Sequence, residues 1–215
     1  MPIDAKNVIC GLVAAAAIAG CATAARDADL DAEFAKMMQS SFRGEGIATT
    51  DRLRQDLGQS ACSSKTPPSP EVAKRIEEEA LATIKWPAGD QYFGDWKVGE
   101  NLAESGRGMT WSDKSADTKE NGGQCYNCHE ITKAEISFGT IGPSLYNYGK
   151  SRGVKSLTDP SAAPVIKYTW GKLWNSKAYA ACSNMPRFGH MKLLSEAQLR
   201  DLMSLLLDPR SPVNN

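Results

Sequence analysis

The sequence has only two histidines and no excess of charge of either sign. Its 25 basic and 25 acidic side chains cancel, so no net field favours nucleic acid or an anionic membrane as a partner. So few histidines leave little material for a catalytic group of the Ser/His/Asp type. No apolar run is long enough to predict a transmembrane span. With 41% hydrophobic residues, the composition is that of a globular protein.

The most informative stretch is the run Cys125-Tyr126-Asn127-Cys128-His129. C-x-x-C-H is the attachment pattern of a c-type haem. Two thiols at this spacing can each add to one vinyl group of a porphyrin, and the adjacent histidine then lies beneath the iron. We therefore predict one covalent haem c, bound by Cys125 and Cys128, with His129 as the proximal iron ligand.

Two other uses of a C-x-x-C pair fit less well. A structural zinc site needs four ligands, and the sequence has no second C-x-x-C and no H-x-x-x-H. A thioredoxin-like site lies between a strand and a helix. The residues before Cys125 are Asn-Gly-Gly-Gln, which show no strand pattern.

Two later motifs match the needs of such a haem. Gly142-Pro143 follows the cysteine motif, and the carbonyl of Pro143 is a candidate acceptor for the His129 imidazole, which would fix its orientation. Met185-Pro186 follows in turn, and we predict Met185 as the sixth, axial ligand of the iron. Met191 and His190 are the alternatives for that position.

The N-terminus resembles an export signal. Residues 8–20 form an alanine-rich apolar run with the length of a signal-peptide core. Ala22-Thr23-Ala24 is a possible cleavage site, whereas residues 18–21 resemble a bacterial lipobox with Cys21 as the acylated residue. We favour simple secretion, and both interpretations place the protein in the periplasm.

The remaining cysteines are expected to pair. Of the six, Cys10 and Cys21 lie in the signal region, and the haem motif uses two more. Cys62 and Cys182 are left, and in an oxidising compartment two such cysteines usually form a disulfide. We predict that this bond joins the N-terminal region to the rest of the protein.

Helical periodicity predicts an all-α protein. The predicted helices cover residues 27–42, 70–86, 96–105, 164–179 and 195–208. Ser69 is a favourable N-cap before Pro70, and Ser195 with Gln198 forms a capping-box pattern. We expect the helices at 96–105 and 195–208 to cross. The predicted organisation is a signal peptide (1–24), a mostly helical extension (25–94) and a cytochrome c domain (95–215).

Taken in order, the motifs C-Y-N-C-H, I-G-P-S-L-Y-N-Y-G, C-S-N-M-P-R-F-G and L-S-E-A-Q-L-R-D-L-M closely resemble those of SoxX. SoxX is the monohaem subunit of the SoxAX cytochrome complex of thiosulfate-oxidising bacteria. The resemblance covers about residues 95–215 and is specific in the last two motifs. It implies the class I cytochrome c fold. The polar loop before Cys125 and the N-terminal extension exceed the smallest members.

The resemblance also implies a function and partners. SoxAX joins thiosulfate oxidatively to a cysteine of the carrier SoxYZ, and the catalytic haem belongs to SoxA. This chain would be a non-catalytic subunit that accepts the electrons and passes them to a small cytochrome c. We expect Trp111, Phe188 or Met191 at the partner surface. The alternatives are a free-standing periplasmic electron shuttle and a ligand-binding or enzymatic cytochrome with an open coordination site.

Overall fold

The computed structural model describes residues 29–215, so the predicted signal peptide lies outside the described part of the chain. The chain divides into two compact units, Met1–Gly44 and Glu45–Asn215. In the first unit, residues 29–41 form a helix, which confirms most of the helix predicted over 27–42. The second unit contains every predicted site residue.

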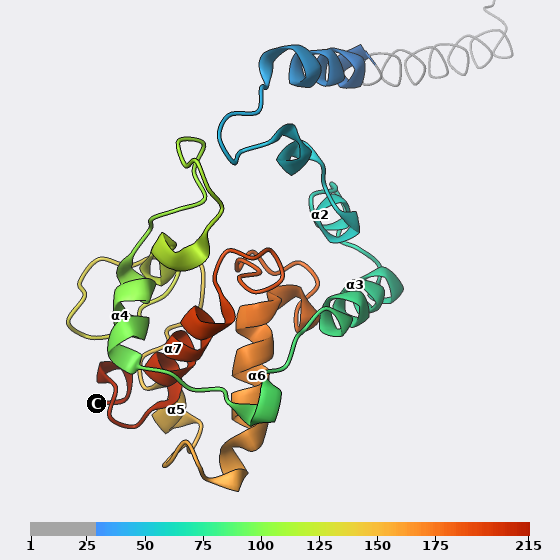
Figure 1. The fold of residues 1–215 in the computed structure, drawn as a ribbon. Helices are drawn as coiled ribbons and strands as arrows, with labels where there is room; N and C mark the ends of the chain where they lie inside the picture. Colours follow the sequence, from blue (N-terminus) through green and yellow to red (C-terminus); the bar gives the residue numbers. More distant parts are fainter. Residues whose placement is uncertain (1–28) are drawn as a thin grey trace, which may run out of the picture. The chain divides into compact units, whose positions relative to one another are not determined.

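The second unit is helical, and residues 29–215 contain no β-strand, which confirms the all-α prediction (Figure 1). Its α-helices are α2 (Leu57–Cys62), α3 (Pro70–Ala82), α4 (Trp96–Glu104), α5 (Tyr148–Ser151), α6 (Ala163–Trp174) and α7 (Glu196–Leu207). Short 3-10 turns and loops connect them.

Side-chain caps fix where two helices begin. The Ser69 hydroxyl accepts from the Val72 amide at the start of α3, where Pro70 occupies the first turn. Ser195 and Gln198 form the predicted capping box at the start of α7. These sequence signals therefore located the N-termini of α3 and α7 correctly.

Helices α4 and α7 pack against each other, as predicted, with their backbones in close approach (Figure 1). A side chain at Gly99 would overlap the carbonyl of Asp201, so only glycine fits at this point of α4. At the start of α4, the Gly94 amide donates to the Ser204 hydroxyl over 2.9 Å, and this hydroxyl donates back to the Gly94 carbonyl. The Asp95 amide donates to the Asp201 carboxylate.

Helix α6 is central to the core. Its buried large apolar side chains are Ile166, Trp170, Leu173 and Trp174. The Trp170 indole donates to the Lys85 carbonyl over 2.8 Å, and the Trp174 indole donates to the Thr83 carbonyl over 3.0 Å. The segment after α3 is therefore part of the same core as α6.

The apolar residues predicted for one face of the helix at 70–86 are Val72, Ile76, Ala80, Leu81 and Ile84. Ile76 and Ala80 on α3 are buried, as is Ile84 just after it, whereas Val72 is half-buried and Leu81 is exposed. The disulfide between Cys62 and Cys182 is present, which confirms the predicted pairing.

Candidate functional site

The C-x-x-C-H run folds as one tight turn. Cys125–Asn127 is a 3-10 turn, and the amides of Cys128 and His129 both donate to the Cys125 carbonyl, over 3.1 and 3.0 Å. Gln124, just before the turn, has a left-handed backbone with φ of 47°. Both thiols are free and half-buried. The turn therefore brings the two thiols and the imidazole into one small region.

The end of α4 holds this turn in place. The Gly123 amide donates to the Leu102 carbonyl over 2.7 Å, and the Gln124 amide donates to the Ser105 carbonyl over 2.9 Å. A side chain at Gly122 would overlap the Ser105 backbone, which explains a glycine there. Through these bonds, the α4–α7 pair sets the position of the two thiols.

The His129 ring is oriented from one side by Gly142-Pro143. Its Nδ1 lies 2.7 Å from the Pro143 carbonyl oxygen, and the Gly142 amide donates to the Cys128 carbonyl over 2.8 Å. A side chain at Gly142 would overlap the imidazole. A carbonyl acceptor requires the proton on Nδ1, which leaves Nε2 as a free donor atom for a metal.

Burial changes the chemistry of the first thiol. It raises the pKa of Cys125 to about 12, and the neighbouring Cys128 adds to the effect. The Cys125 side chain packs against the edge of the hydrophobic core. The thiol is therefore protonated at neutral pH, as expected of a cysteine in apolar surroundings.

Met185 lies on a different loop, which follows the short turn Ser176–Ala178. The Ser176 hydroxyl donates to the Met185 carbonyl over 2.6 Å, and the Met185 amide donates to the Ser183 hydroxyl over 3.3 Å. The Met185 side chain packs against the same core as Cys125.

A cavity of about 480 Å³ lies beside Met185. Met191 also lines it and is 48% exposed. His190 lines a different cavity, of about 260 Å³. Met185 and Met191 therefore line the same cavity, whereas His190 lines the other one.

The segment Leu193-Leu194 connects the Met185 side to the cysteine side. Leu193 lines the Met185 cavity, and its carbonyl accepts from the Asn121 side-chain amide over 2.8 Å. A Cβ atom at Gly123 would lie 3.0 Å from the Cys125 sulfur and 3.9 Å from the Leu194 side chain. Leu193 therefore contacts both the Met185 cavity and Asn121, four residues before Cys125.

Helix α2 contacts the Met185 loop through an ion pair that the sequence did not predict. Asp56, the N-cap of α2, forms an ion pair of 2.7 Å with Arg187. Burial raises the pKa of Asp56, but the Gln59 amide and Arg187 outweigh it, and the net pKa is lowered. Asp56 and Gln59 form a capping box, and this D-x-x-Q spacing is the sequence signal that would have located α2.

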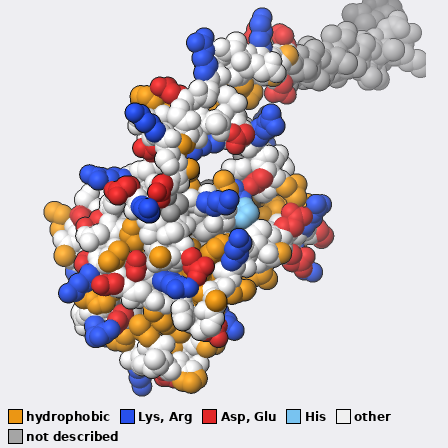
Figure 2. Space-filling view, in the orientation of Figure 1, with side chains coloured by type: hydrophobic (Ala, Val, Ile, Leu, Met, Phe, Trp, Pro, Cys, Tyr) orange, Lys and Arg blue, Asp and Glu red, His pale blue; other side chains and the backbone are white. Residues whose placement is uncertain are grey.

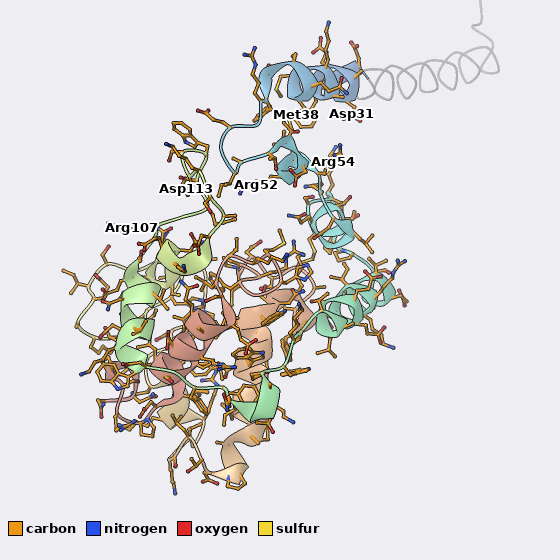
Figure 3. All side chains as sticks on the ribbon, in the orientation of Figure 1. Asp31, Met38, Arg52, Arg54, Arg107 and Asp113 are labelled. Carbon is orange, nitrogen blue, oxygen red and sulfur yellow. A yellow bond between two sulfur atoms is a disulfide. The ribbon has the colours of Figure 1, made fainter. Side chains whose placement is uncertain are left out.

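The polar loop before Cys125 contacts the start of the second unit. The Ile47 amide donates to the Asp113 carbonyl over 3.2 Å, and the Arg52 guanidinium donates to the Met109 carbonyl over 3.2 Å. Figure 3 labels Arg52 and Asp113, which lie on these two neighbouring segments. The loop is therefore held by hydrogen bonds to Ile47 and Arg52 as well as by its two ends.

The expected partner-facing residues differ in exposure. Trp111 is 63% exposed, but Phe188 is only 5% exposed, so the expectation for Phe188 was wrong. Phe188 is buried because it belongs to the core packed against α6 and α7. Ile136 and Ile141, between His129 and Pro143, are strongly exposed apolar residues. Figure 2 shows basic and acidic side chains interspersed on the face drawn, with apolar side chains between them.

Residues 29–215 contain neither a cluster of metal-binding side chains nor a helix that could span a membrane. No group of three or more His, Cys, Asp or Glu side chains there is arranged to hold a metal ion. No helix in this part of the chain is long and apolar enough to cross a membrane.

The chain is similar to a protein of known sequence. The chain is 37% identical over 165 residues to an uncharacterized lipoprotein of Aquifex aeolicus (strain VF5), and the match covers 74% of this chain and 73% of the relative. The chain belongs to the same family as this lipoprotein. No protein-family model matches the chain.

Proposed function

We propose that the protein is a c-type cytochrome that transfers electrons. Cys125 and Cys128 would hold the haem covalently, and His129 and Met185 would coordinate its iron. The observation that carries the proposal is the 2.7 Å contact between His129 Nδ1 and the Pro143 carbonyl. A carbonyl that accepts from the imidazole of a metal-binding histidine fixes the orientation of the ring and raises its basicity, so this contact supports His129 as the proximal ligand. The predicted class I cytochrome c fold is part of this proposal.

Other features of the site fit a haem. The thiols of Cys125 and Cys128 are both free, and the absence of a side chain at Gly142 leaves the imidazole room to lie against the chain. Apolar side chains near the motif, such as Ile141, suit a large apolar group. When bound, a haem with a thioether ligand supplies a one-electron carrier of raised potential. The chain's own part is to bind the group, orient the imidazole and exclude water.

Expression in a host that matures c-type cytochromes tests this proposal. We expect the protein to retain a haem stain after denaturing electrophoresis, because the attachment is covalent. The variant C125A/C128A should lose the stain. The matched control C62S/C182S, which removes the two disulfide cysteines instead, should keep it. A wild-type protein without covalent haem would contradict the proposal.

The resemblance to SoxX motivates a more specific proposal. We propose that the chain is the monohaem subunit of a thiosulfate-oxidising complex, with a SoxA-like haem subunit, a SoxYZ-like carrier and a small cytochrome c acceptor as partners. Joining thiosulfate to a carrier cysteine forms one S–S bond and releases two electrons and a proton. A single one-electron carrier would therefore transfer them in two successive steps.

A pull-down of the natively secreted protein separates this proposal from the free electron shuttle. In the complex, a second haem protein remains bound, and thiosulfate with its carrier reduces the haem of this chain. A shuttle is recovered alone and does not respond to thiosulfate. The shuttle needs only the site residues, whereas the complex also needs an exposed docking surface, for which the exposed side chain of Trp111 is a candidate.

We propose that the protein is exported to the periplasm, and the relative bears on how it is held there. Because that relative is named a lipoprotein, it favours acylation at Cys21 over simple secretion. Cys21 lies outside the described residues. Mass spectrometry of the mature N-terminus tests this: a diacylglycerol group on Cys21 supports a lipid anchor, and an N-terminus after Ala24 supports a free protein.

A further inference from the structure

Helix α2 contacts the loop that carries Met185 at two points, one on each side of the methionine. Cys62, the last residue of α2, is disulfide-bonded to Cys182. Asp56, the N-cap of the same helix, pairs with Arg187 over 2.7 Å. We call residues 182–187 the Met185 segment. Both of its ends are thus joined to one short helix, by a covalent bond and by an ion pair.

The turn Ser176–Ala178 also holds the Met185 segment. The Ser176 hydroxyl donates to the Met185 carbonyl over 2.6 Å. The buried Lys177 ammonium donates to the Ala181 carbonyl over 3.1 Å, just before the segment begins. Between these anchors, residues 182–187 contain no helix, so their own backbone bonds do not fix them.

We propose that α2 is a clamp that positions Met185, with Asp56 and Cys62 as its positioning residues. The part concerning iron ligation rests on the proposed cytochrome function. A thioether is a neutral, weak ligand, and the cavity of about 480 Å³ beside Met185 gives the side chain space to move away. The disulfide spans a sequence separation of 120 residues, so it removes much of the freedom of the segment in any opened state.

Two variants each remove one half of the clamp. C62S/C182S removes the covalent half. D56N removes the ionic half but keeps an acceptor for the Gln59 amide, which donates to Asp56 over 2.7 Å, so α2 stays capped. The matched control is E79Q, which breaks the exposed Arg75–Glu79 ion pair on α3 by the same chemical change.

The first measurement is amide hydrogen exchange of residues 183–188, which does not depend on the haem. We expect exchange to be faster by roughly tenfold or more in C62S/C182S and by a few-fold in D56N, with no change in E79Q. The second is imidazole binding to the oxidised protein, because imidazole must displace the axial ligand. We expect its affinity to rise by roughly tenfold in C62S/C182S and less in D56N.

The outcomes separate this proposal from the proposed function. Unchanged exchange in both variants would overturn the clamp. Faster exchange with unchanged imidazole affinity would show a held loop that does not position an iron ligand, which would overturn the positioning of Met185 but leave the covalent haem intact. A wild-type protein without a haem stain would overturn the proposed function, and with it the ligand-positioning role of α2. If C62S/C182S does not fold, D56N decides the outcome alone.

Discussion

Met185 is the residue on which the redox behaviour of the proposed cytochrome depends. Replacing it with alanine removes the thioether, so the weak sulfur-to-iron absorption band in the red should disappear. The reduction potential should fall by on the order of 0.1 V, within the roughly 0.8 V that axial ligands span. Spectroscopy and redox titration of M185A measure both effects.

Met191 is the matched control for this prediction, because it lines the same cavity and is half exposed. M191A should keep the red band and the wild-type potential. If M191A loses the band and M185A keeps it, the sixth ligand is Met191, which the sequence left open as an alternative.

Asp201 is predicted to cost stability at neutral pH. Burial raises its pKa, the Asp95 amide opposes this over a 2.8 Å hydrogen bond, and the Asp95 carboxylate adds to the rise. A carboxyl group whose pKa is higher in the folded state than in the unfolded state stabilises the fold at pH values below its unfolded pKa of about 3.9. This stabilisation is lost as the pH rises through the folded-state pKa. Asparagine keeps the acceptor and removes the charge.

We therefore expect D201N to unfold at a higher temperature than the wild type at pH 7, and at the same temperature under acidic conditions where Asp201 is protonated. Thermal unfolding followed by circular dichroism at the two pH values checks this. An equal loss of stability at both would show that the carboxylate contributes a specific interaction which the amide cannot replace.

At the scale of single residues, the contacts of residues that belong to a known motif could be predicted from the sequence. The turn of Cys125 to His129 and the contact of Pro143 with the imidazole follow from the order of motifs along the chain. The pairing of Cys62 with Cys182 followed from the number of cysteines left over and the oxidising compartment. The Asp56–Arg187 pair was not predictable, because a charge pair between distant segments has no periodic signal. The exposure of Phe188 was predicted wrongly, because the sequence after a motif does not show whether an aromatic side chain is buried or exposed.

Gly99 controls how closely α4 and α7 approach, which sets the position of the thiol turn. In G99V the added side chain would overlap the Asp201 carbonyl, so the helices must separate. We expect a loss of about 1–3 kcal/mol in the free energy of unfolding. The thermal midpoint should fall by about 2–4 °C for each kcal/mol in a protein of this size.

The neighbouring residue provides the control for this helix contact. Val98 is 45% exposed on the other side of α4, so V98A should change stability by no more than about 0.5 kcal/mol. If the two variants unfold at the same temperature, the close approach of α4 and α7 at Gly99 does not contribute to stability.

At the scale of elements, long periodic helices were predictable and short ones were not. α3, α4, α6 and α7 each have an apolar stripe and a recognisable end, and all four were expected. α2 and α5 are too short to show a stripe. α5 begins after Asn147, whose left-handed φ of 57° no periodicity reveals. These short helices form through tertiary contacts, such as the Asn214 side chain that accepts from the Gly149 amide.

At the scale of the whole molecule, the compact unit that carries the C-x-x-C-H motif begins earlier than the sequence predicted. The sequence placed the boundary at 94/95, whereas the compact unit of the structure starts at Glu45. Residues between these points supply acceptors for the core: the Lys85 carbonyl for the Trp170 indole and the Thr83 carbonyl for the Trp174 indole.

A truncation series tests the boundary. A chain of residues 45–215 should unfold cooperatively, like the full protein, because it keeps every contact of the second unit. A chain of residues 95–215 leaves two buried indoles unpaired, at about 1–3 kcal/mol each, and loses a disulfide that contributes about 2–4 kcal/mol. Since domains are stable by only about 5–15 kcal/mol, we expect the shorter chain to unfold at a much lower urea concentration or not to fold at all. Equal urea midpoints for the two chains would instead place the boundary at residue 95 and make residues 45–94 an accessory to a self-sufficient cytochrome.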